Sequence, residues 1–473
     1  MVTARPPADQ AAPDGEDDGY HKALRPHQVQ MIAIGGVIST GLFLGTGGRL
    51  ASAGPGLFLA YALCGVFVFF IMRALGELVL YRPTSGSFVS YAREFYGEKL
   101  AFAVGWLFYF RWSTSSIAQI SAIAAYVQYW DPAEAVPHWL TALIALVLVV
   151  CMNLASVKWF GELEFWTAMI KVVALVTFLV VGTVVLVGRF QVAGHSTGIG
   201  MVADNGGLFP TGLSSFVFVI TGAVYSYGAT ELVGTAAGET SDPERTMPRA
   251  INAVIGRIAL FYVGSLLLLG LLLPYTAFKQ GESPFVTFFG RLGVGGAGSI
   301  MSLVMVTAAL SCLNAGLYAT GRSLRSMAVS GSAPAIAARM SKGGVPYVGI
   351  LATAGLALVG VGLNAVVPQQ AYEIVLNMSA LSVIAVWAVI LACQLRLWSR
   401  WRRGQAQRAS FRLVGTPYTA VATLVFLLAI IVLMVAGGTA AQRGALVAMC
   451  VVMTPALIGG WFLRRRFGSP SPE

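Results

Sequence analysis

The chain has 473 residues, of which 57% are hydrophobic and only 11% are charged, and its mean hydropathy is +0.75. Soluble domains carry roughly 25% charged residues, so this composition excludes a conventional soluble enzyme. The apolar residues come in runs of about 20, the length that crosses the hydrocarbon core of a bilayer. The sequence therefore predicts an all-α polytopic membrane protein, in which the placement of the basic residues must explain the net charge of +11.

Residues 1–28 are rich in proline, alanine and acidic residues and lack the order of a cleaved signal peptide. They are predicted to be a disordered cytoplasmic tail. Twelve apolar segments follow, each predicted to be a transmembrane helix: 30–48, 55–76, 101–129, 139–155, 165–187, 213–235, 251–274, 297–319, 347–367, 371–394, 417–437 and 444–463.

The lysines and arginines predict the orientation. With both termini in the cytoplasm, 23 of the 31 lie in cytoplasmic segments, and the few expected outside include Arg49. The positive-inside rule therefore predicts a multi-pass protein of the cell membrane with cytoplasmic termini. Spread over seven segments, these residues are expected to face lipid headgroups, not nucleic acid. Glu77 and Glu94 lie among them and are predicted to form ion pairs in a loop.

The first and sixth segments interrupt their own helical pattern. Residues 35–41 read GGVISTG and residues 225–231 read YSYGATE, and such a matched pair in two halves indicates an inverted-repeat transporter. Unwound backbone is tolerated in a membrane where it meets a ligand. An amino acid offers a carboxylate for free N–H groups and an ammonium for free carbonyls. Gly41 and Gly45 also form G-x-x-x-G, so close helix packing remains an alternative.

Four predicted helices carry charges inside the membrane segments, and one of these charges, Arg257 near the start of the seventh segment, is predicted only to anchor its helix. Glu231 follows the second interruption, where a carboxylate costs several kcal/mol unless protonated or paired; it is predicted to carry a proton or gate, or to cap free amides. Lys171 in the fifth segment couples transport to protons or snorkels to the headgroups. Arg111, Ser115 and Gln119 share one face of the third segment. Arg111 could pair with Glu231, hold an anionic side chain, or snorkel.

Five longer motifs extend over most of the chain: GGVISTGLF at 35–43, RALGEL at 73–78, YRPTSGSF at 81–88, ELVGTAAGETSDP at 231–243 and SCLNAGLYATGR at 311–322. They resemble the amino acid transporter (amino acid permease) family of the amino acid-polyamine-organocation superfamily. Within that family, GSFVSYAREF at 86–95 and SPFVTFF at 283–289 are most similar to bacterial asparagine permeases, followed by D-serine, D-alanine and glycine permeases.

The resemblance implies a five-plus-five inverted repeat in which helices 1 and 6 are broken, with two extra helices. Its parts would be residues 29–190 as the first repeat, 191–396 as the second, 397–466 as helices 11 and 12, and 467–473 as a cytoplasmic tail. It also implies alternating access and import of a small polar amino acid with a proton. An amino acid exchanger, or an importer of D-serine, D-alanine or glycine, is the alternative.

The resemblance also implies roles for single residues. N–H groups around Thr40 and Gly41 would hold the substrate carboxylate, and backbone carbonyls from both broken helices would take its ammonium. Gln119 stands where many relatives have an acid, so an amide substrate fits it and a cationic one does not. Lys171 would replace a sodium ion with a removable proton. The predicted substrate-binding residues are Val37, Ser39, Thr40, Gly41, Gln119, Tyr225, Tyr227 and Gly228, with Glu231, Lys171 and Arg111 predicted for coupling or gating.

No cofactor or metal is expected. All five cysteines lie singly inside apolar segments, all four histidines lie outside them, and the sequence contains neither H-E-x-x-H nor G-x-x-x-x-G-K-[ST]. An ATP-driven pump and a membrane-embedded enzyme are therefore not expected. The predicted partners are an amino acid, a proton and the lipid bilayer, with the protein a monomer or homodimer.

Overall fold

The computed structural model describes residue 38 and residues 40–84, 87–155, 157–231, 234, 243–341, 343–436 and 440–464. In this part of the chain the regular structure is helical, apart from one bridge between Val192 and His195. Nine of its helices are long and apolar enough to cross a membrane. The prediction of an all-α polytopic membrane protein is confirmed. The two predicted tails, and with them Val37 and Ser39, lie outside the described residues.

Nine of the twelve predicted segments correspond to these spans. Two of the spans contain a π-helical turn, η4 (Ile258–Gly264) and η7 (Met449–Met453). The nine spans are built from α4 (Leu57–Tyr81), α7 (His138–Ala155), α8 (Val157–Val187), α12 (Pro243–Arg257) with α13 (Ser265–Leu272), α15 (Ala297–Val329), α16 (Tyr347–Val366), α17 (Pro368–Arg402), α18 (Tyr418–Ala436), and α19 (Ala440–Ala448) with α20 (Thr454–Leu463).

The other three predicted segments are less regular or more polar. The third is α6 (Glu98–Val127), which is 30 residues long but carries a run of serine and threonine beside Arg111. The first is present as the short α2 (Thr40–Phe43) and as α3 (Gly45–Ala53), which a turn at Leu44 separates. The sixth is α10 (Leu213–Tyr227), which is only 15 residues long. Two of these exceptions are therefore the segments predicted to be interrupted.

The described residues at both predicted interruptions have a clear local geometry. α10 ends at Tyr227, Gly228 is extended with φ −57° and ψ 147°, and Ala229 adopts φ 87°. A residue other than glycine that adopts a positive φ costs of order 1–3 kcal/mol of conformational energy. Such a backbone conformation persists only where surrounding contacts enforce it. In the first segment Ile38 lies in a bend and α2 begins at Thr40. We call residues 38–41 the helix 1 break and residues 228–231 the helix 6 break.

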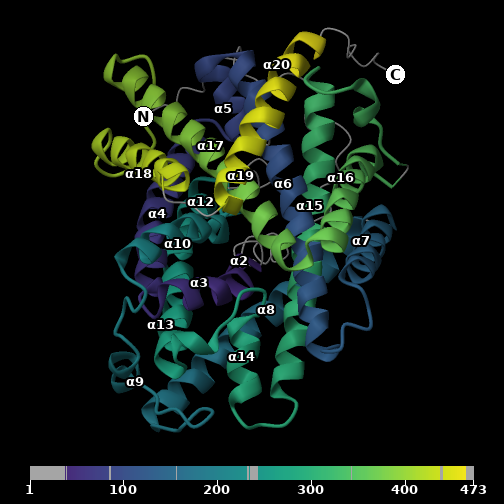
Figure 1. Cartoon of the computed structure of the whole chain (residues 1–473). Helices are drawn as coiled ribbons and strands as arrows, with labels where there is room; N and C mark the ends of the chain where they lie inside the picture. Colours follow the sequence, from purple (N-terminus) through teal and green to yellow (C-terminus); the bar gives the residue numbers. More distant parts are fainter. Residues whose placement is uncertain are drawn as a thin grey trace.

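Shorter helices lie at the two ends of the bundle. Figure 1 shows α5 (Ser87–Tyr96) at one end, and α9 (Ile199–Asp204) and α14 (Pro284–Arg291) at the other. We call the end at α5 the basic end, because Arg400 and Arg82 both contact Glu94 of this helix there. The prediction that Glu94 forms ion pairs with basic neighbours is thereby confirmed.

α6 forms the centre of the fold. It packs against α15, α16 and α17, and the half of it from Arg111 to Ala124 is buried. The outer helices instead expose apolar side chains, such as Val180 and Val184 on α8 and Val425 and Leu428 on α18. Apolar side chains that face outward along whole helices are suited to contact the lipid acyl chains of a membrane.

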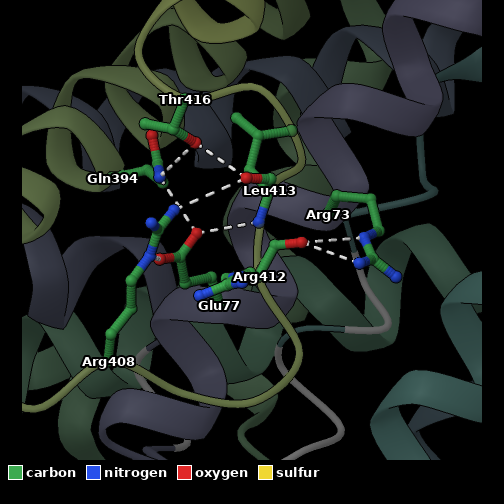
Figure 2. A network of polar contacts seen from close by, with 7 residues as sticks. All are labelled: Arg73, Glu77, Gln394, Arg408, Arg412, Leu413 and Thr416. Atoms are coloured by element: carbon green, nitrogen blue, oxygen red, sulfur yellow. Dashed lines mark hydrogen bonds and ion pairs between the residues drawn. The ribbon is translucent and has the colours of Figure 1, made fainter.

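A network at the basic end joins α4 to the loop of residues 403–417, which connects α17 and α18 (Figure 2). The Glu77 carboxylate is fully buried and accepts hydrogen bonds from Arg408 Nε at 2.7 Å, the Leu413 backbone N–H at 2.9 Å and Gln394 Nε2 at 3.0 Å. Arg73 donates to the carbonyl of Arg412 at 2.7 and 3.1 Å. The predicted ion pair of Glu77 is confirmed, although it lies in the interior instead of on a solvated loop.

Candidate functional site

The helix 1 break packs against the end of α10, just before the helix 6 break. A Cβ atom on Gly41 would lie 2.8 Å from both Cα and Oγ of Ser226 and 3.0 Å from Cδ1 of Tyr225. Such distances are too short for any side chain, so glycine is required for the helix 1 break to reach the end of α10. At Gly41 the close-packing role and the predicted site therefore coincide.

Side chains from two other helices, α17 and α6, lie at this meeting point. The Tyr372 hydroxyl of α17 donates to the Thr40 carbonyl at 3.0 Å, and the hydroxyl of Tyr225 interacts with that of Ser115 on α6. Thr40 is itself buried, and its hydroxyl oxygen lies near the Tyr225 side chain but makes no hydrogen bond of good geometry among the described residues. The structure thus places Thr40, Gly41 and Tyr225 of the predicted set together, with a polar atom of Thr40 unsatisfied.

Arg111 and Glu231 form a buried ion pair beside the helix 6 break. Arg111 Nη1 lies 3.4 Å from Glu231 Oε1, and the two side chains are 3% and 1% exposed. Trp387 of α17 donates its indole N–H to the other carboxylate oxygen at 3.3 Å. A Cβ on Gly228 would lie 2.6 Å from Arg111 Nη2, so glycine leaves room for the guanidinium. Of the three alternatives for Arg111, pairing with Glu231 is confirmed and snorkelling is wrong.

Arg49 corrects the sequence analysis. It was expected outside the membrane segments, yet it is buried in α3 and reaches back toward the helix 1 break. Its Nη1 donates to the Tyr61 hydroxyl at 2.8 Å and to Gly41 O and Ser226 Oγ, each at 3.2 Å. Gly222 of α10 makes space for it, since a Cβ there would lie 2.1 Å from Arg49 Nε.

A sequence signal for this position of Arg49 exists. Arg49 follows Gly41 by eight residues, close to two turns of a helix, so its side chain can lie over the break. The predicted first segment ends at residue 48, so Arg49 falls one residue outside it. Glu373, near the start of α17, interacts electrostatically with the guanidinium, and hydropathy could not have indicated that approach.

Lys171 lies on the other side of the helix 1 break. Its side chain is fully buried, and Nζ is 3.7 Å from the Cys312 sulfur of α15, which in turn lies 3.9 Å from the carbonyl oxygen of Ile38. An ammonium held here cannot reach the headgroups, so the snorkelling alternative is wrong. Glu164, one of the residues that sequence analysis missed, is buried on the same helix, and its two carboxylate oxygens share the hydroxyl proton of Ser311 in a bifurcated hydrogen bond.

Gln119 and Tyr227 complete the predicted set. Gln119 is 2% exposed on α6, and its side-chain carbonyl oxygen has no hydrogen-bond partner in the described part of the chain. Tyr227 instead donates its hydroxyl to the Tyr61 carbonyl at 2.8 Å, and its ring lies tilted against the rings of Tyr61 and Tyr262, at 5.8 and 4.8 Å between centroids. These are the contacts of a packing residue that fixes α10 against α4.

Comparison with known proteins shows which family and which proteins this chain is similar to. The family model described as amino acid permease matches residues 28–467. The chain is 60% identical to L-asparagine permease 1 of Mycobacterium tuberculosis (strain ATCC 25618 / H37Rv), over 96% of this chain and 92% of the relative. It is 56% identical to the L-asparagine permease of Escherichia coli (strain K12), over 89% and 84%, and 51% identical to that of Streptomyces coelicolor, over 98% and 95%.

Proposed function

Because the chain belongs to the amino acid permease family, we propose that it imports L-asparagine together with a proton across the cell membrane. The family consists of transporters, so the prediction that this chain is not an enzyme is confirmed. The relatives named above are L-asparagine permeases, and the similarity covers 92% and 95% of the length of two of them. Their similarity supports the same substrate for this chain.

The observation that carries the site is a pair of buried polar atoms, one in the helix 1 break and one on α6, the helix that carries Ser115 and Arg111. Thr40 Oγ1 and the Gln119 carbonyl oxygen are buried and make no hydrogen bond of good geometry among the described residues. A buried polar atom without a partner costs about 1–3 kcal/mol, so both favour a polar ligand. The side-chain amide of asparagine carries two N–H donors and one acceptor, which suits the Gln119 oxygen and the Thr40 hydroxyl group.

Main-chain groups would bind the α-carboxylate and the α-ammonium group of the substrate. N–H groups around Thr40 and Gly41, with Ser39 beside them, would hold the carboxylate. Carbonyls of Val37, Tyr225 and Gly228 would accept from the ammonium. The Tyr225 carbonyl already accepts from the Gly228 N–H at 2.9 Å, but a carbonyl oxygen has a second lone pair.

Lys171 is the better of the two proton carriers. Glu231 balances the buried charge of Arg111, and protonating it would leave a cation unpaired in the interior, which is strongly unfavourable. Lys171 has the Cys312 thiol beside it and contacts the helix 1 break through that residue. We therefore assign proton coupling to Lys171 and gating of the helix 6 break to Glu231 with Arg111.

Alternating access completes the proposal. A five-plus-five repeat with helices 1 and 6 broken, and cytoplasmic termini at the basic end, would let the substrate site open to each side in turn. The protein would act as a monomer or homodimer.

Uptake of labelled L-asparagine into proteoliposomes tests the function. We expect accumulation when the outside is acidic and the inside alkaline, and its loss when a protonophore is added. Accumulation that survives the protonophore would contradict proton coupling. Counterflow without net uptake under the same gradient would instead identify an exchanger.

Competition decides the substrate. We expect unlabelled L-asparagine to inhibit uptake at lower concentrations than D-serine, D-alanine, glycine or L-aspartate. Stronger inhibition by any of these four would reassign the substrate while leaving the coupling experiment valid. K171Q should retain counterflow while losing accumulation, because exchange does not require the proton to be released.

A further inference from the structure

A second buried charge lies on the same helix as Lys171. Glu164 is 1% exposed, and its carboxylate accepts from the Ser311 hydroxyl at 2.9 Å on one oxygen and 3.0 Å on the other. Asn314 of α15 also lies next to this carboxylate, and it accepts a hydrogen bond from Asn153 of α7 at 2.7 Å. A carboxylate this deeply buried needs such partners and a cation to remain in the protein interior.

The cation available to it is Lys171. The two residues are seven apart on α8, which places them on one face of the helix, and they interact electrostatically. Both are met by consecutive residues of α15, Ser311 at the carboxylate and Cys312 at the ammonium. Lys171 and Cys312 are the titratable groups that interact with Glu164 in the described part of the chain. Glu164, Lys171 and these two residues of α15 therefore form one unit.

We infer that Glu164 is a positioning residue for proton coupling, which holds the Lys171 ammonium charged and directed at Cys312 beside the helix 1 break. The inference rests on the proposed function, in which Lys171 carries the proton. In the cycle the ammonium loses one proton to the cytoplasmic solution and becomes a neutral amine. The transported proton is thus assigned to Lys171, while Glu164 acts through its contact with Ser311 and its electrostatic interaction with Lys171.

The pH dependence of uptake tests this role. Without the carboxylate, the ammonium form of Lys171 is less favourable, so a more acidic outside is needed to form it. In E164Q we expect the pH of half-maximal uptake to fall by about one pH unit or more, as for the loss of a nearby opposite charge. Counterflow should remain. E164D, which keeps the charge, should restore most of the wild-type profile, whereas a purely structural role would not move the profile.

A matched control and a milder variant complete the experiment. Glu282 has an exposed side chain that contacts Lys279 in the loop before α14, so E282Q should keep the wild-type profile. S311A keeps the carboxylate but removes its bifurcated hydrogen bond with the Ser311 hydroxyl, and we expect a smaller shift in the same direction. It decides the question if E164Q does not fold.

Two results would overturn the inference. One is a folded E164Q with counterflow and an unchanged pH profile; the other, where E164Q does not fold, is S311A with an unchanged profile. Failure of the proposed function is distinguishable from both, since wild-type protein would then accumulate L-asparagine in the presence of protonophore or not transport it at all.

Discussion

The guanidinium of Arg111 and the carboxylate of Glu231 lie 3.4 Å apart, with almost no exposure of either side chain. The pair joins the central helix α6 to the helix 6 break, and Trp387 adds α17 to the contact. Taking two charges out of water costs several kcal/mol per ion, and their mutual attraction offsets this only while both remain. Either charge without its partner would therefore destabilise the folded protein.

Removing one partner should cost more than removing both. We expect E231Q to lower the free energy of unfolding by about 3–5 kcal/mol, because Arg111 is left uncompensated. The double variant R111Q/E231Q should lose less than E231Q alone, because no buried charge is then left uncompensated. Thermal unfolding of the purified protein in detergent measures this. Additive losses would show that the two side chains act independently.

E231Q also separates gating from coupling. If Glu231 gates the helix 6 break, accumulation and counterflow should fall together in the folded variant. Counterflow that persists while accumulation is lost would make Glu231 the proton carrier in place of Lys171. Both rates are measured in the same proteoliposomes.

Arg49 should be sensitive to a single added methyl group. In G222A the new Cβ would overlap Arg49 Nε at 2.1 Å, which pushes the guanidinium away from Gly41 and Ser226. We expect uptake to fall at least tenfold. Gly256 of α12 has open space around its position, so G256A is the matched control and should transport like the wild type. Equal rates in both variants would rule out a role for the position of Arg49.

Replacing Gln119 should affect the KM for L-asparagine more than the maximal rate of transport. In Q119L the side chain keeps its approximate size but cannot accept from the substrate amide. Loss of one such hydrogen bond costs about 1–3 kcal/mol, so we expect KM for L-asparagine to rise about tenfold with little change in maximal rate. Gln280, exposed in the loop before α14, provides the control Q280L. An unchanged KM in Q119L would remove Gln119 from the site.

Two carboxylates at the basic end should differ in their effect on stability. E77Q leaves Arg408 without its buried partner, and we expect a loss of about 3 kcal/mol in the free energy of unfolding. Glu98 pairs with Arg93 at 2.8 Å, but its side chain is 45% exposed. E98Q should therefore cost about 0–1 kcal/mol. Thermal unfolding of both variants checks the contrast, and equal losses would contradict it.

The sequence predicted which helices are regular and that the sixth segment loses its helical pattern near residue 227, because these properties depend on local residues. Glycine and small polar residues at 35–41 and 225–231 weaken a helix wherever they occur. α10 does end inside the second of these stretches, at Tyr227. Gln119 and Arg111 were found in the same way, since polar residues at membrane depth stand out from their neighbours.

Contacts between distant helices could not be predicted from the sequence. Glu164 lies at the edge of an apolar segment, and its importance depends on Ser311, which is 147 residues away. The direction of Arg49 depends on the small residue Gly222, and the burial of Glu77 depends on a loop 331 residues further along. Each is a question of which side chains meet after folding, and hydropathy carries no information about that.

The attachment of residues 403–417 to Glu77 also has a practical side. Most loops that connect membrane helices accept inserted tags or fusion partners, because few of their groups are hydrogen-bonded to the rest of the protein. In this loop, the Leu413 N–H and the Arg412 carbonyl are both bound to α4. An affinity tag for purification or a reporter for topology is therefore better inserted at residues 193–196, which form an exposed turn around Gly194 at the opposite end.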